Sequence, residues 1–110
     1  MTPNPVTYFE IPVTYMGRVI EFYEAVFAVA LERVQIDGHD MALFAFDEKH
    51  PGISGALAKG ESYVPSRGGP RVYFSVQSID QTLTRIRSLG AEIAYPKTLV
   101  GNFWIAVFIN

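Results

Sequence analysis

The chain has 110 residues, which is enough for one domain of ordinary size. Apolar residues make up 49% of it, with 8 Phe and 6 Tyr, so it can form a hydrophobic core. The formal net charge of -2 is too small to favour nucleic acid or an anionic membrane surface as a partner. There is no cysteine, which excludes disulfides and thiolate metal sites.

Targeting segments are not evident in the sequence. The first residues lack the positive charge and apolar run of a secretory signal peptide. No apolar run approaches the roughly 20 residues that a membrane span needs. We therefore expect a cytoplasmic protein with neither a nucleic-acid nor a membrane partner.

The first half of the chain predicts a strand, a helix and three further strands. Residues 6–13 alternate and are rich in β-branched and aromatic side chains, and Pro12 favours an edge position for this strand. Apolar residues then recur every three to four positions from Met16 to Phe27, which predicts a helix. The tight-turn pair Asp37-Gly38 lies between the first two of the three later strands, predicted at 29–36, 41–46 and 53–59.

The second half repeats part of this order after a turn-rich linker at about 60–70. Residues 71–76 predict a strand that leads into a helix, with Ser78 and Gln81 in the capping-box pattern. Gly90 suits the residue just after the helix, where φ is positive. Laying VTYFEIPVTYM over GPRVYFSVQSI aligns the apolar positions, which is a weak internal repeat. The last predicted strands are 91–95 and 103–109.

The two strand-to-helix openings, IPVTYMGRVIEFYEAVF and RVYFSVQSIDQTLTRIRSLGAEI, resemble those of the vicinal-oxygen-chelate superfamily of glyoxalases, bleomycin-resistance proteins and dioxygenases. The first opening has an apolar strand ending at Val13 and the pair Phe22-Tyr23. The resemblance implies an α+β fold in one domain, 1–110, built from two βαβββ modules at about 1–60 and 71–110. The modules would form an open, cupped mixed sheet, with a small-molecule cavity between them. Homodimers are common in this superfamily.

Many members of the superfamily hold a divalent metal at four His or Glu positions. The resemblance places the first at Tyr8, the third at Arg71 and the second within residues 54–56. None of these is a competent ligand, because neutral Tyr binds such metals poorly and Arg does not deprotonate. The fourth position belongs to a last strand that would follow Asn110, so we expect the native chain to continue. We expect no bound metal and no cofactor.

Alternation along the predicted strands gives the candidate cavity residues, because every second side chain points to the same face. By the resemblance these are Tyr8, Glu10, Arg71, Tyr73 and Ser75. Glu10 could serve as a general base, but a structural ion pair with Arg71 is the preferred interpretation. Trp104 is either an aromatic wall for a ligand or a core residue. The two histidines, His39 and His50, are expected in solvated loops.

Three functional hypotheses remain open at this point. The preferred one is a metal-independent protein that binds a small molecule in the cavity. The second is an enzyme of the superfamily, a lyase, isomerase or dioxygenase. The third is an interaction module that acts through homodimerisation and whose cavity is vestigial.

Overall fold

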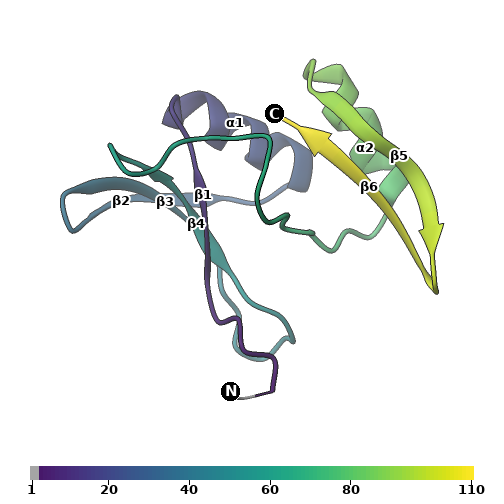
Figure 1. Cartoon of the computed structure of the whole chain (residues 1–110), viewed down its shortest axis with the longest axis horizontal. Helices are drawn as coiled ribbons and strands as arrows, with labels where there is room; N and C mark the ends of the chain where they lie inside the picture. Colours follow the sequence, from purple (N-terminus) through teal and green to yellow (C-terminus); the bar gives the residue numbers. More distant parts are fainter. Residues whose placement is uncertain (1–2) are drawn as a thin grey trace. The chain divides into compact units, whose positions relative to one another are not determined.

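A computed structural model describes residues 3–110, and within them it contains two helices and six strands (Figure 1). The chain divides into two compact units. Unit 1 comprises the residues up to Glu24 together with Ala28–Pro65, and unit 2 comprises Ala25–Phe27 together with Ser66–Asn110. The α+β class expected from the sequence is confirmed. Within residues 3–110, no helix is long and apolar enough to cross a membrane.

Unit 1 contains a four-stranded mixed sheet in the order β1-β4-β3-β2. The first strand pairs in parallel with the last, and the other pairs are antiparallel. This is the expected βαβββ arrangement, and Pro12 lies in an edge strand as predicted. The elements are β1 (Phe9–Pro12), α1 (Met16–Phe27), β2 (Leu31–Ile36), β3 (His39–Phe44) and β4 (Gly55–Lys59).

Helix α1 packs on one face of this sheet through its apolar stripe. The Tyr23 ring meets Phe44 edge-on at 5.6 Å, and Phe44 lies 5.8 Å from Phe9. The side chains that share this face include Ala42 and Leu57, both completely buried. The buried residues of the helix match the predicted spacing: Met16, Val19, Phe22, Tyr23 and Val26.

The turn between β2 and β3 is as short as the sequence predicts. Asp37 and Gly38 both have positive φ, at 50° and 75°, which suits a two-residue hairpin turn. Strand pairing therefore begins at once, with Ile36 opposite His39. The expectation that His39 is a solvated loop residue was wrong, because the turn is too short to exclude it from the strand.

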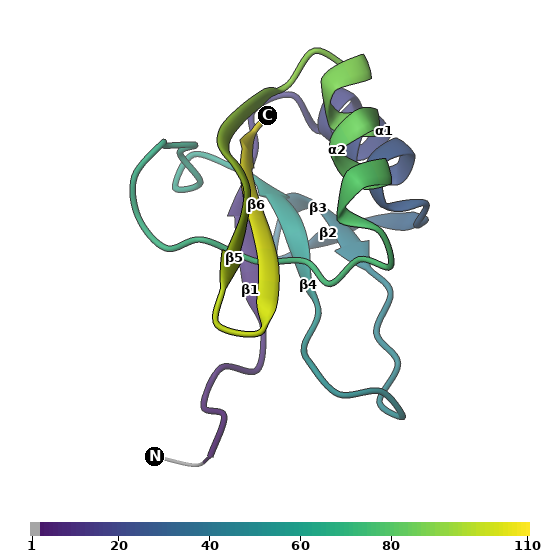
Figure 2. The same cartoon turned by 90° about the vertical axis from the view of Figure 1, so that its right-hand side faces the viewer.

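Unit 2 contains α2 (Ile79–Ser88) and a hairpin of β5 (Glu92–Val100) and β6 (Phe103–Ile109), shown in yellow-green and yellow in Figure 2. The predicted N-cap is confirmed, since the Gln81 amide donates to Ser78 Oγ at 3.2 Å. Gly90 has the positive φ predicted for it, 81°. Strand β5 is longer than predicted, and its register shifts between Tyr95 and Thr98, around Pro96. Proline has no amide proton for the ladder, which accounts for the irregularity.

The predicted strand at 71–76 is absent from the structure. A strand is defined by ladder hydrogen bonds to a neighbour, and this segment pairs with no strand among residues 3–110. Its alternation is still visible in packing, because the Phe74 ring lies 4.6 Å from Phe27 while Tyr73 is exposed. Unit 2 therefore shows the helix and two strands of the expected second module, but not its opening strand.

Candidate functional site

The sheet of unit 1 has a second face, pointing away from α1, which we call the open face. One row of paired residues crosses it from edge to edge: Glu10, Ala56, Leu43 and Glu32. Paired residues point to the same side of a sheet, so this row lies on one face. The neighbouring buried cluster is Met41, Ala56 and Ala58, against which Val34, Leu43 and Tyr63 pack.

The carboxylate of Glu10 is the centre of a hydrogen-bonded group on this face. The Tyr8 hydroxyl donates to Oε2 at 3.1 Å, and the Tyr63 hydroxyl donates to Oε1 at 2.9 Å. Tyr63 lies just beyond β4, where its amide donates to the Gly60 carbonyl at 3.1 Å, and its ring packs onto the sheet. We call Tyr8, Glu10 and Tyr63 the Glu10 cluster.

Both phenols of the Glu10 cluster remain proton donors at neutral pH. The pKa of Tyr8 is raised, mainly by burial and then by its hydrogen bond to Glu10. The pKa of Tyr63 is raised chiefly by its hydrogen bond to Glu10, then by burial and by the charges of Glu10 and Asp37. Each cause disfavours a phenolate, so the cluster carries its negative charge on the carboxylate.

His39 lies beside the cluster. Its ring meets Tyr63 edge-on, with 5.6 Å between ring centroids. The close approach extends to Gly60, where an added Cβ would lie 2.5 Å from Cδ2 of His39. His39 therefore helps to hold the segment that carries Tyr63 against the open face.

The structure places the predicted site residues in both units. It brings Tyr8 and Glu10 together, although Tyr8 precedes the first strand by one residue. The others lie in unit 2, all with exposed side chains: Arg71, Tyr73, Ser75 and Trp104. Because Glu10 and Arg71 belong to different units, their ion pair stays a prediction.

Trp104 is a surface residue, 55% exposed, so the interpretation of it as a core residue was wrong. The ammonium of Lys97 lies 4.9 Å from its ring centroid and also donates to the Asp80 carboxylate at 3.1 Å. The ring is thus stabilised at the surface by a cation instead of by burial.

Sequence reasoning did not identify Tyr63, which was assigned to the linker. Its segment, GESYVPSRGGP, is dominated by turn residues, and alternation does not extend into it. The available signal was an aromatic residue isolated among polar neighbours. The hydrogen bond to Glu10 spans 53 positions in sequence and could not be inferred from local pattern.

The residues at the metal positions of the resemblance do not fit a divalent ion. The hydroxyl of Tyr8 is protonated and donates to Glu10, residues 54–56 carry neither a carboxylate nor an imidazole, and Arg71 is cationic. Within residues 3–110, no three His, Asp or Glu side chains are grouped so that they could hold a metal. Glu10 would have to bind such an ion without a second carboxylate or an imidazole at these positions.

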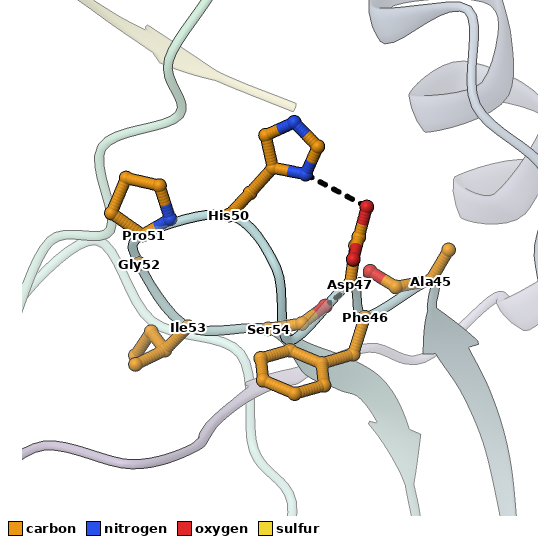
Figure 3. A pocket seen from close by; sticks show the side chains of 8 residues that line it. All are labelled: Ala45, Phe46, Asp47, His50, Pro51, Gly52, Ile53 and Ser54. Atoms are coloured by element: carbon orange, nitrogen blue, oxygen red, sulfur yellow. Dashed lines mark hydrogen bonds and ion pairs between the residues drawn. The ribbon is translucent and has the colours of Figure 1, made fainter.

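A small surface pocket of about 150 Å³ lies in the loop between β3 and β4 (Figure 3). His50 points toward Asp47, with 2.7 Å between Nδ1 and Oδ2. Ser54 also lines this pocket, but its hydroxyl donates to the carbonyls of Phe44 and Ala45. The serine proton is therefore engaged by the backbone and not by the imidazole, so the three side chains do not form a nucleophilic triad.

Several solved structures share this fold. A glyoxalase I mutant from Zea mays matches with a TM-score of 0.63 and 17% identity, over 96% of this chain and 42% of that one. A mutant of the fosfomycin resistance protein FosX from Listeria monocytogenes, complexed with Mn(II) and 1S,2S-dihydroxypropylphosphonic acid, has a TM-score of 0.64 and 17% identity. That match covers 89% of this chain and 78% of FosX. A hypothetical protein from S. aureus matches with a TM-score of 0.61 and 13% identity, over 98% of this chain and 86% of that one.

The chain therefore has the fold of the vicinal-oxygen-chelate superfamily, to which glyoxalase I and FosX belong. No protein-family model matches the sequence, and no curated protein matches it. The chain spans less than half of the maize glyoxalase I chain. At these identities the likeness defines the fold and leaves the activity to be argued from the site.

Proposed function

We propose that this protein binds a small organic molecule over the open face of unit 1 without the help of a metal. The observation that carries the proposal is the Glu10 cluster, a charged carboxylate held by two phenol donors on the sheet face that α1 leaves free. Ligand sites combine a few fixed polar groups with apolar surroundings, and here the half-buried Val34 and Leu43 supply the latter. We further propose a cytoplasmic location, with which the lack of cysteine is compatible.

Binding is favoured over catalysis by the way in which Glu10 is engaged. A general base needs a free lone pair directed at the substrate proton. One of the two lone pairs on each carboxylate oxygen of Glu10 already accepts a phenol hydrogen bond, at 3.1 and 2.9 Å, so fewer lone pairs remain for a substrate proton. The FosX mutant was solved as a complex with Mn(II) and 1S,2S-dihydroxypropylphosphonic acid. At Tyr8, residues 54–56 and Arg71, which the resemblance equates with metal-ligand positions, this chain has neither a carboxylate nor an imidazole. A metal-dependent lyase, isomerase or dioxygenase reaction is therefore the weaker proposal.

The proposal is tested by titrating the ¹⁵N-labelled protein with a panel of neutral, acidic and basic small molecules. Amide shifts are expected to concentrate at the Glu10 cluster and on β3, and to persist in the presence of a chelator. Glu10→Ala should abolish them, whereas Glu21→Ala, an exposed change on α1, should not. Saturable shifts confined to unit 2, or no shifts with any compound, would contradict it.

A homodimer is the second candidate, and a specific surface favours it. On the β5–β6 hairpin, Val100 and Phe103 are opposite one another and are 52% and 74% exposed. Exposed apolar pairs of this kind commonly mark interaction surfaces. Sedimentation at micromolar concentration should then give a dimer that Phe103→Glu dissociates. A monomer under these conditions would exclude the dimer as the functional state.

A further inference from the structure

Charges are distributed unequally between the two faces of the sheet in unit 1. The row across the open face has a carboxylate at each end, Glu10 on β1 and Glu32 on β2. The Lys and Arg residues of this sheet are Arg33 on β2 and Lys59 on β4, and both side chains point to the opposite face. There Arg33 forms an ion pair with Asp40 at 2.7 Å. Among the described strand residues, the open face therefore carries acidic groups but neither Lys nor Arg.

Among the described residues of unit 1, Glu10 is in no ion pair that would neutralise it. Within the described part of unit 1, its polar partners are the neutral phenols of Tyr8 and Tyr63, and it forms no ion pair. The surroundings of Tyr63 are also negative, because the charges of Glu10 and Asp37 both raise its pKa. Aromatic rings next to a carboxylate favour an organic ammonium group, which gains from both charge and ring contact.

The other end of the row has the same charge and more space. Glu32 and Leu43 border an open hollow of about 420 Å³ at the end of the β2–β3 ladder, which Leu31 and Phe44 of the opposite face also line. The ring of Phe46 beside it is 63% exposed. Between the two carboxylates the row is apolar, with Ala56 completely buried and Leu43 half-buried, and Tyr63 packs against the same buried cluster. The two ends are three strand spacings apart, which is roughly 14 Å at about 4.8 Å per spacing.

From this pattern we propose that the open face binds a linear organic dication of the polyamine type, with one ammonium at Glu10 and the other at Glu32. The chain of such a molecule covers the apolar stretch over Leu43 and Tyr63. This inference rests on the proposed function, because it names the ligand class of the same face. The imidazole of His39 lies beside the cluster, and the test is therefore run at a single pH of 8.

The experiment measures, by calorimetry at low ionic strength, the affinity of the full chain for four probes that each have a linear chain of ten carbons. They are 1,10-diaminodecane, decylamine, 1,10-decanediol and decanedioic acid. The diamine is expected to bind most tightly, about tenfold better than the monoamine, and the diol and the diacid hardly at all. Because exposed charges are screened by salt, raising the ionic strength should weaken diamine binding and narrow its advantage over the monoamine.

Two variants locate the anchors. Glu10→Gln removes the charge and keeps one of the two acceptor oxygens that the phenols use, and Glu32→Gln removes the charge at the hollow. Each is expected to weaken diamine binding roughly three- to tenfold and to leave the diamine no better than the monoamine. Glu21→Gln, with the same change of charge on the outer side of α1, should bind as the wild type does.

The outcomes separate this inference from the function on which it rests. Equal binding of diamine and monoamine, or an unchanged affinity in Glu32→Gln, overturns the dication. Binding of the diol or the diacid in preference to the amines, with amide shifts at the Glu10 cluster, also overturns it but leaves small-molecule binding intact. A third outcome is that none of the four ten-carbon probes shifts the amides of the Glu10 cluster, while neutral compounds from the small-molecule panel do. The dication proposal is then overturned, and small-molecule binding stands.

Discussion

At the scale of single residues, the parallel contact between β1 and β4 depends on the absence of a side chain at Gly55. A Cβ there would collide with the carbonyl oxygen of Phe9 and approach its ring to 2.7 Å. Gly55→Ala should therefore force the strands apart and destabilise the protein by about 1–3 kcal/mol in urea denaturation. Glu10 lies on β1, so its amide resonance should shift as well.

Gly17→Ala is the matched control for this change. A Cβ at Gly17 meets nothing within 4 Å, and the residue lies in the first turn of α1. Alanine is the better helix former, so stability should stay constant or rise by up to about 1 kcal/mol. Equal losses in the two variants would show that the close approach at Gly55 is not what limits the substitution.

Tyr23 should make the protein sensitive to alkali. Burial raises the pKa of Tyr23 to about 12 from the ordinary value of 10.0. A raised folded-state pKa means that the stabilisation is complete below pH 10 and is lost as the pH rises through 12. At about 1.4 kcal/mol per pKa unit, the loss from this group is roughly 2–3 kcal/mol.

The comparison of Tyr23→Phe with the wild type isolates this contribution. Free energies of unfolding are measured by urea titration from pH 9 to 12, and the variant should lose less stability over that range. Tyr15→Phe removes an exposed hydroxyl and should follow the wild type. Parallel curves for Tyr23→Phe and the wild type would contradict the burial argument.

At the scale of elements, α2 is stabilised at its first turn by a cap that the sequence identifies on its own. Ser78 Oγ accepts from the Gln81 amide at 3.2 Å, and Asp80 and the basic pair Arg85 and Arg87 suit the two ends of the helix dipole. Ser78→Ala should cost about 1 kcal/mol, and Ser78→Asp should restore most of it. Circular dichroism during urea denaturation measures both changes.

Local patterns predicted the helices and hairpin turns well because caps, turns and apolar spacing are properties of adjacent residues. The cap at Ser78 and the turn at Asp37 and Gly38 are confirmed for this reason. The strand predicted at 71–76 was wrong because alternation indicates which side chains are buried and not whether a partner strand exists. The candidate site shows the same limit. Alternation near the first strand puts Tyr8 and Glu10 on one side, so both could be predicted, whereas Tyr63 comes from a distant turn and could not.

At the scale of the whole molecule, the two openings that resemble one another in sequence have different outcomes. The first becomes a complete βαβββ unit with a four-stranded sheet. The second becomes a helix and a two-stranded hairpin among the residues described. A hairpin alone is marginally stable in water, so β5 and β6 are stabilised by their packing within unit 2, including against α2.

One part of that packing is an aromatic group, which gives the last prediction. Phe27 belongs to unit 2 and lies 4.6 Å from the Phe74 ring and 6.3 Å from the Phe108 ring of β6. Phe27→Ala removes both contacts and should destabilise unit 2 by about 2–4 kcal/mol, somewhat less than a fully buried ring would. Hydrogen exchange should then accelerate in β5 and β6 far more than in β3, because the sheet of unit 1 has its own core at Leu57. If exchange accelerated equally throughout, the chain would unfold as one cooperative body, and the division into two units would describe its geometry but not its energetics.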